Sequence, residues 1–477
     1  MLFNSPQFIL FFIVTVTLFY LGPHVLKWGV LILASAFFYY QWQPWFVLIL
    51  AGVVLSTWAI SLLMSLQNDP KVKKFYLAAS IFINLGLLLG FKYTNFAISS
   101  VNIALERSVF DYSFDPVNLM LPIGLSFYSL AAIGYSFDVY RENIKPERHL
   151  GHFALFMSFF PKLISGPIER GVSFLPQLKE KIHLDPEKFS VGFHLFVWGI
   201  FKKVVIADRL KLYVDMVYGN PYDYSGKSLI LATWFFTVQI YCDFSAYTDM
   251  ARGCGKMLGF DLSENFNFPY FARSIHDFWK RWHITLTSWF RDYLYIPLGG
   301  NRAAYLRWMI NIMIVFLVSG LWHGASWTFV VWGGLHGFFY LTEQVGKPLF
   351  QKALGAFSIP DLLLRPVQIF ITFNLVAFAW IFFRADSFEK AFHIATHLFS
   401  DMGAPLQMGS SVFTTIITLA LLACFTVLET GRLLMMNQKT GFTMRIPYPV
   451  KSVWMVGILI TTFLFGAASS QFIYFHF

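Results

Sequence analysis

The chain has 477 residues, of which 57% are hydrophobic and only 13% charged, whereas soluble proteins average about 25% charged residues. Aromatic residues make up 19%, a share that suits lipid-facing surfaces and the aromatic belts at membrane interfaces. The composition argues against a soluble enzyme and predicts an integral membrane protein. Because no polar linker divides the chain, we interpret residues 1–477 as a single integral membrane domain.

The chain carries 36 Lys and Arg against 26 Asp and Glu, a net charge of +10. In a membrane protein such an excess lies on the cytoplasmic side and attracts anionic lipid, so membrane lipid is an expected partner. No basic polar face with interleaved aromatic residues is present, and we therefore predict no nucleic-acid binding. The three cysteines lack CxxC spacing, which favours neither a disulfide framework nor a metal site.

Apolar runs long enough to cross a bilayer recur from end to end, and we predict about a dozen spans. The first run follows no basic residue and precedes no cleavage signal, so we expect it to be retained. Basic loops at 71–74 and 141–148 favour the cytoplasm, which places the N-terminus outside. The predicted spans are residues 8–22, 26–43, 46–66, 75–96, 119–139, 190–207, 228–248, 308–322, 327–345, 366–383, 412–429 and 453–472.

Three further apolar stretches, residues 153–168, 200–218 and 276–300, are interrupted by charged residues or proline. Non-helical backbone at membrane depth is tolerated only where protein or a wet cavity covers it. We therefore predict an all-α fold, a polytopic transmembrane helical bundle with re-entrant or interfacial helices around a central funnel. No internal repeat is visible, which disfavours the repeated architecture of many secondary transporters.

The stretch 271–302 combines charged and aromatic side chains within an apolar context. Charged groups are costly in hydrocarbon, so they face an interior path or the interface. Here rings and charges alternate around the helix, which favours a wet, substrate-facing segment over an interfacial helix with snorkelling Arg and Lys. The residues expected to bind substrate or donor, in this stretch and just beyond it, are Trp279, Arg281, Trp282, Arg291, Asp292, Tyr293 and Trp322.

Residues 308–341 contain no Asp, Glu, Lys or Arg, and one straight helix of that length would measure about 50 Å. The hydrocarbon core is only about 30 Å thick, so the run must break, and Gly and Ser make 320–326 its weakest part. His323 lies at this break. A neutral imidazole is a natural general base for a hydroxyl, and we predict that His323 is catalytic. His283 is the candidate for a second group that steadies the oxyanion or the leaving thiolate.

Other features leave alternatives open. On one helix, His336 would lie about 20 Å from His323, so we expect no close pair, and packing is as good an explanation for His336 as function. The sequence has no G-x-S-x-G, Walker A or H-E-x-x-H motif. Asp243 and Asp249 could bind substrate, hold a cation or pair with an arginine such as Arg273 or Arg281. We favour structural pairing.

Several sequence blocks resemble the membrane-bound O-acyltransferases, most closely the bacterial branch of the alginate O-acetyltransferase membrane subunit and the teichoic-acid D-alanyl transfer protein. The resemblance covers nearly the whole chain and implies an essential histidine at His323 and a second at His283. It also implies a ring of tilted helices around a thin centre with funnels from both faces. The blocks are SFFPKLISGPIER (158–170), FSAYTDMARGCGKMLGF (244–260), RWHITLTSWFRDYLYIPLGGNR (281–302) and SGLWHGASW (319–327).

The resemblance implies O-acetylation of an extracytoplasmic polysaccharide by a multi-pass protein of the bacterial inner membrane. The expected donor is acetyl-CoA or an acyl-carrier-protein thioester at the cytoplasmic face, with no bound cofactor. An extracytoplasmic SGNH-hydrolase-like acetyltransferase is the expected partner, because this chain has no hydrolase-like domain.

Three alternatives remain. The same chemistry could transfer D-alanine from a carrier-protein thioester to a cell-wall polymer. A lipid-linked sugar transporter or flippase would explain the spans and the buried charge, but not the two histidine blocks. A non-catalytic scaffold predicts that His323→Ala is silent.

Overall fold

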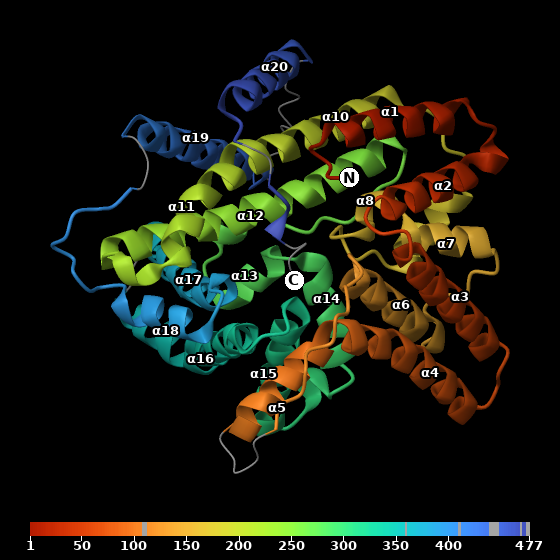
Figure 1. Ribbon diagram of the computed structural model, residues 1–477, viewed down its shortest axis with the longest axis horizontal. Coiled ribbons are helices and arrows are strands. Elements are labelled where there is room, and N and C mark those ends of the chain that lie inside the picture. The colour runs from red at the N-terminus through yellow and green to blue at the C-terminus, as the bar shows by residue number, and fades with distance from the viewer. Residues whose placement is uncertain (107–111, 358–359, 409–411, 438–447, 468–469, 474–477) are drawn as a thin grey trace. The chain divides into compact units, whose positions relative to one another are not determined.

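The computed structural model describes residues 1–106, 112–357, 360–408, 412–437, 448–467 and 470–473 (Figure 1). Regular structure in these residues is helical and includes no strand, which confirms the predicted all-α class. The chain divides into two compact units, Met1–Phe196 with Met250–Ser263, and Val197–Asp249 with Glu264–His476. The prediction of a single domain stays a prediction.

In the part of the chain that the structure describes, seven helices are long and apolar enough to cross a membrane, and the chain is a multi-pass integral membrane protein. They are Phe46–Ser65, Pro70–Glu106, Pro186–Gly219, Gly226–Met257, Tyr305–His323, Asp361–Arg384 and Thr414–Leu434, and shorter apolar helices cover Pro6–Leu21, His24–Tyr40 and Ser452–Phe465. The expected dozen therefore exceeds the number of helices in the described ranges that have the length and hydropathy of a span. Several predicted spans correspond to short helices.

The first unit contains helices whose starts are set by local sequence. Ser5 accepts a hydrogen bond from the Phe8 backbone N–H at 3.2 Å, and Pro6 occupies the first helical position of α1. Its helices are α1 (Pro6–Leu21), α2 (Lys27–Tyr40), α3 (Phe46–Ser65), α4 (Pro70–Leu88), α5 (Thr94–Glu106), α6 (Leu125–Tyr140), α7 (Leu150–Ser158), α8 (Phe160–Leu163), α9 (Gly171–Phe174) and most of α10 (Pro186–Phe201).

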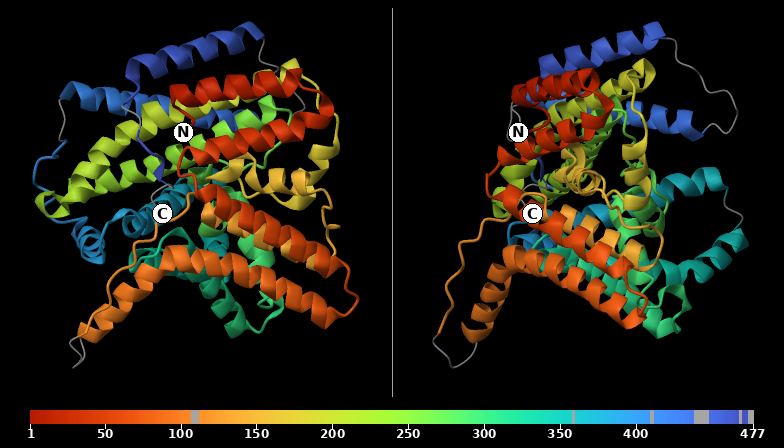
Figure 2. Two further views of the ribbon diagram at one scale, coloured as in Figure 1. Left: turned by 45° about the vertical axis from the view of Figure 1, so that its right-hand side comes forward. Right: turned by 90° about the vertical axis from the view of Figure 1, so that its right-hand side faces the viewer.

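Phenylalanine forms much of the core of this unit. The ring of Phe8 is fully buried, and its centroid lies 6.0 Å from that of Phe38 and 6.3 Å from that of Phe160. Elsewhere in the unit, α3, α4 and α6 pack side by side (Figure 2). Lipid tails are as apolar as these side chains, so the hydrophobic effect does not drive helices together in a membrane. Close packing of large rings supplies dispersion contacts that hold the helices together instead.

The α-helical backbone is interrupted within each of the three stretches, and their re-entrant or interfacial placement stays a prediction. The first breaks at Phe159, between α7 and α8. The second contains a π-helix, η4 (Lys202–Ala207), between α10 and α11 (Asp208–Gly219). The third comprises α13 (Ile275–Arg281), α14 (Ile284–Phe290) and the π-helix η7 (Arg291–Tyr295). π-Helical turns are frequent at functional sites, which draws attention to the second and third stretches.

The second unit holds the remaining long helices. They are α12 (Gly226–Met257, in part), α15 (Tyr305–His323), α16 (Trp327–Phe357), α17 (Asp361–Arg384), α18 (Phe388–His397), α19 (Val412–Asn437) and α20 (Tyr448–Phe465). Helices α15 and α16 form a tight hairpin that crosses at two glycines. A Cβ on Gly320 would clash with the Phe329 carbonyl oxygen, and one on Gly333 with the Phe316 carbonyl oxygen.

We expect Gly320→Ala to destabilise the protein by about 1–3 kcal/mol, because the added methyl group must push the two helix backbones apart. Activity should fall as well, since Gly320 lies one turn before His323. Gly334→Ala is the matched control, because its Cβ would meet only a Leu317 methyl group at 3.7 Å. Thermal unfolding in detergent measures both variants. Equal midpoints would contradict the close crossing.

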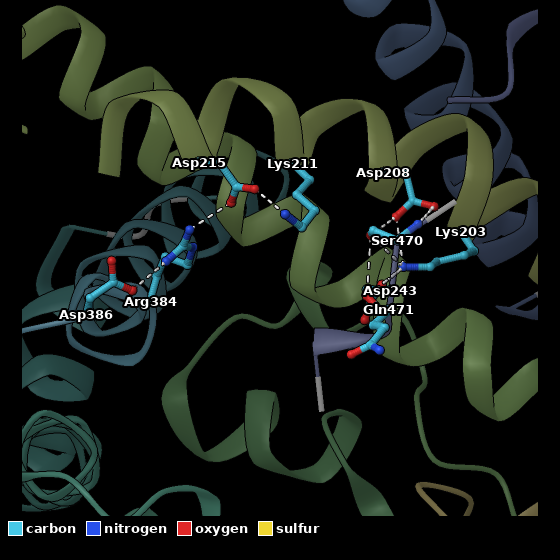
Figure 3. Close-up of polar contacts among 9 residues, drawn as sticks. All are labelled: Lys203, Asp208, Lys211, Asp215, Asp243, Arg384, Asp386, Ser470 and Gln471. Carbon is cyan, nitrogen blue, oxygen red and sulfur yellow. Dashed lines mark hydrogen bonds and ion pairs between the residues drawn. The ribbon is translucent and has the colours of Figure 1, made fainter. Parts of the chain in front are cut away.

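Two adjacent lysines of η4 reach into α12 with fully buried side chains. Lys202 binds Asp249 at 2.8 Å. Lys203 binds Asp243 at 2.7 Å and Asp208 at 2.8 Å (Figure 3). Structural pairing of Asp243 and Asp249 is thus confirmed, but the partners are lysines rather than arginines. The lysine partners could not be predicted from the sequence, because a π-helical turn directs both side chains to α12.

Candidate active site

His323 is the last residue of α15. Gly324 follows in extended conformation (φ −158°, ψ 146°) and α16 begins at Trp327, which confirms the predicted helix break. The His323 side chain is only 3% exposed. Its ring centroid lies 4.9 Å from that of Trp322, 5.0 Å from that of Trp332 and 5.4 Å from that of Phe383. The helix end therefore presents this imidazole within an aromatic enclosure.

His283 occupies the turn between α13 and α14 and is fully buried. Its backbone is left-handed (φ 44°, ψ 53°), a conformation that is uncommon for a residue other than glycine and persists only where the surroundings hold it. The centroid of its ring lies 6.4 Å from that of His323, and Trp322 contacts both histidines. The structure thus brings together two histidines that are 40 residues apart in the chain.

Asn265 holds this turn in place. Its backbone carbonyl accepts from the Ile284 N–H at 3.0 Å. Its side-chain Oδ1 lies 3.2 Å from the Thr285 backbone N, 3.0 Å from Thr285 Oγ1 and 3.2 Å from His283 Nδ1. The role of Asn265 in this turn could not be predicted from the sequence, because no periodicity or motif links Asn265 to a turn 18 residues later.

The walls around His283 are mainly aromatic. Phe244 of α12 lies with its ring centroid 4.8 Å from that of His283, and Phe266 at 6.5 Å. Burial lowers the pKa of His283, because desolvation disfavours the imidazolium form. The ring is therefore neutral at ordinary pH, which suits a group that accepts or donates a hydrogen bond to a reacting atom.

A second aromatic layer lies behind the two histidines. Trp332 contacts His323 at 5.0 Å and His336 at 5.0 Å, so one indole ring packs against both histidines. Trp279 packs against His336 at 4.9 Å, and Trp282 packs against Trp380 at 5.1 Å. The expectation that His323 and His336 form no close pair stays a prediction.

The other residues predicted to bind substrate or donor are distributed differently. Arg281 pairs with Asp277 at 2.8 Å, and Arg291, whose side chain is 62% exposed, pairs with the adjacent Asp292 at 2.7 Å. Tyr293 is buried against Trp289. Of the predicted set, the structure brings Trp322 to both histidines, Trp279 and Trp282 into the second layer, and the charged residues into local ion pairs. No group of three or more His, Cys, Asp or Glu in the described ranges could hold a metal ion.

The sequence of this chain is similar to a family of known proteins. The model of the membrane-bound O-acyltransferase family matches residues 34–381. The chain is 36% identical to the probable alginate O-acetylase AlgI of Pseudomonas aeruginosa, over 89% of this chain and 81% of that protein. It is 35% identical to the peptidoglycan O-acetyltransferase of Helicobacter pylori, over 83% and 79%. Likeness to the teichoic acid D-alanyltransferase of Bacillus subtilis is weaker, 28% over 46% of this chain and 58% of that protein.

The chain belongs to the membrane-bound O-acyltransferase family and is an acyltransferase. Both histidines described above lie within the matched residues, in the second compact unit.

Proposed function

We propose that this chain transfers an acetyl group from acetyl-CoA in the cytosol to a polysaccharide outside the bacterial inner membrane, with His323 as the catalytic base. The observation that supports this most strongly is the placement of His323 beside His283 in a buried aromatic enclosure, in a chain of this family. The relatives named as acting on alginate and peptidoglycan support a polysaccharide acceptor.

The proposed step is hydroxyl attack on a thioester. The acceptor oxygen attacks the acetyl carbonyl, the new C–O bond forms and the C–S bond breaks. The hydroxyl proton passes to the imidazole of His323 and from there to the departing thiolate, which leaves as the CoA thiol. His283 would orient the acyl donor or the acceptor beside His323. Trp322, which contacts both rings, would line the site of the acyl group.

The remaining predicted residues fit the donor side of this proposal. Trp279 and Trp282 support the enclosure from behind, and Tyr293 is buried on the π-helix η7 with Asp292 beside it. Arg281 and the exposed Arg291 are the cations offered to an anionic donor, acetyl-CoA or an acyl-carrier protein at the cytoplasmic face. The acetyl group would then reach the polymer directly or through an extracytoplasmic SGNH-hydrolase-like partner.

The test compares a host strain that lacks this chain with one that expresses it. Acyl groups released from the surface polysaccharide by mild base are identified by chromatography. We expect acetate to appear only when the chain is expressed. Released D-alanine would favour the D-alanyl alternative, to which the weaker teichoic-acid relative points. No difference in acyl content would contradict both.

A further inference from the structure

The orientation of the Asn265 side-chain amide is fixed by its neighbours. A backbone N–H can only donate, so the amide atom facing the Thr285 N–H, at 3.2 Å, is the oxygen. The same oxygen accepts from the Thr285 hydroxyl at 3.0 Å. His283 Nδ1 lies 3.2 Å from this oxygen and therefore faces an acceptor. A neutral imidazole in that position must carry its proton on Nδ1, which leaves the lone pair on Nε2.

We propose that Asn265 is a positioning residue that holds His283 as the Nδ1–H tautomer, so that its Nε2 lone pair serves the acyl-transfer site. This inference rests on the proposed function, since it assigns His283 to that site. Asn265 acts through two parts of its structure. The backbone carbonyl fixes the left-handed turn through Ile284, and the side chain fixes the ring.

Among the described residues, the side chains whose rings lie nearest to His283 are mostly aromatic. The elements packed against the ring present Phe244 from α12, Phe266 from the segment before α13, and Trp322 and the titratable His323 from α15. Asp243, next to Phe244 in α12, is paired with Lys203. Replacing Asn265 therefore changes the polar partner on Nδ1 of an otherwise largely aromatic site.

Asn265→Leu removes the acceptor while keeping a side chain of similar size. We expect kcat to fall about 10- to 100-fold, the cost typical of losing the partner that orients a functional imidazole, with an unchanged KM for acetyl-CoA. Thr287→Val in the same turn is the matched control. Its hydroxyl donates to the Trp282 carbonyl at 3.3 Å, and kcat should be unchanged. The assay uses membrane vesicles with the full chain, acetyl-CoA and de-acetylated surface polysaccharide of the host.

Asn265→Asp keeps the acceptor oxygen and adds a negative charge. A carboxylate against Nδ1–H favours the imidazolium and raises the pKa of His283 by about 1–3 units. Activity requires the neutral ring and is lost as the pH falls through this pKa, so the acid limb of the rate–pH profile should move to higher pH. A merely structural role would leave the limb in place, even if the variant were less stable.

A double mutant distinguishes a wrong role for Asn265 from a wrong role for His283. In the His283→Ala background, Asn265→Leu should cause no additional loss of kcat, because the two residues act as one unit. If His283→Ala itself leaves kcat unchanged, the role of His283 in the proposed function is wrong. If His283→Ala lowers kcat but Asn265→Leu does not, only the positioning role is overturned. An unshifted acid limb for Asn265→Asp overturns it as well, even if Asn265→Leu fails to fold.

Discussion

Replacing His323 with alanine should lower the rate constant of acyl transfer by about 10²- to 10⁴-fold, the contribution of a positioned general base. The side chain ends α15 inside an aromatic enclosure, so its removal takes away the proposed base. We expect the KM for acetyl-CoA to change little, because the imidazole acts in the transition state rather than in donor binding. The measurement is kcat in vesicles, with the amount of protein in the membrane determined in parallel.

His336 supplies a matched control for this experiment. It is fully buried, its ring centroid lies 5.0 Å from that of Trp332, and within the described residues neither of its ring nitrogens has a hydrogen-bond partner. An apolar ring can replace such a group at little cost, so His336→Phe should keep both stability and activity. Normal O-acetylation with His323→Ala would contradict its catalytic role and favour the scaffold alternative. Equal losses in both variants would point to packing.

His323 and His283 differ in how well their placement could be predicted from the sequence. The position of His323 could be predicted, because a run of uncharged residues too long for the bilayer must break where Gly and Ser weaken the helix. The meeting of His283 with His323 could not be derived from the residues alone. It depends on a left-handed turn held by Asn265, and hydrogen bonds between residues 18 positions apart, with α13 between them, leave no periodic signal.

The same limit applies to the fold. The helical class and the three interrupted stretches followed from composition and from charges within apolar runs, because lipid forces backbone groups to pair within helices. The number of helices long enough to span the membrane could not be predicted from the sequence, because hydropathy locates an apolar helix but does not determine its length. Pairing of Asp243 and Asp249 was expected, but a π-helical turn decides that Lys202 and Lys203 are the partners.

A large loss of stability is expected when the buried cluster of Lys203, Asp208 and Asp243 loses its lysine. Lys203→Met should lower the free energy of unfolding by about 3–5 kcal/mol, because it leaves two buried carboxylates without their cation. The side chains of Lys203, Asp208 and Asp243 are 0%, 2% and 3% exposed. Ser470 Oγ donates to Asp208 at 2.6 Å and the Ile473 N–H donates to Asp243 at 2.7 Å, but neutral donors cannot replace a full charge. The measurement is the unfolding midpoint of the detergent-solubilised protein.

Lys211→Met, two turns further along the same helical segment, is the control. Lys211 pairs with Asp215, but these side chains are 34% and 38% exposed, and Asp215 also keeps its 2.7 Å ion pair with Arg384 (Figure 3). Solvent screens this pair, so its loss should cost no more than about 1 kcal/mol. Equal midpoints for the two lysine variants would show that the buried cluster is solvated.

Neutralising the carboxylates separates charge from packing. Adding Asp208→Asn and Asp243→Asn to Lys203→Met removes the uncompensated charges while keeping side-chain oxygens that can accept from Ser470 and Ile473. If buried charge causes the loss, this triple variant should be more stable than Lys203→Met alone. If the lysine stem contributes mainly by filling space, the triple variant should be no better. Because Phe244, which follows Asp243 in α12, packs on His283, partial recovery of activity should accompany recovery of stability.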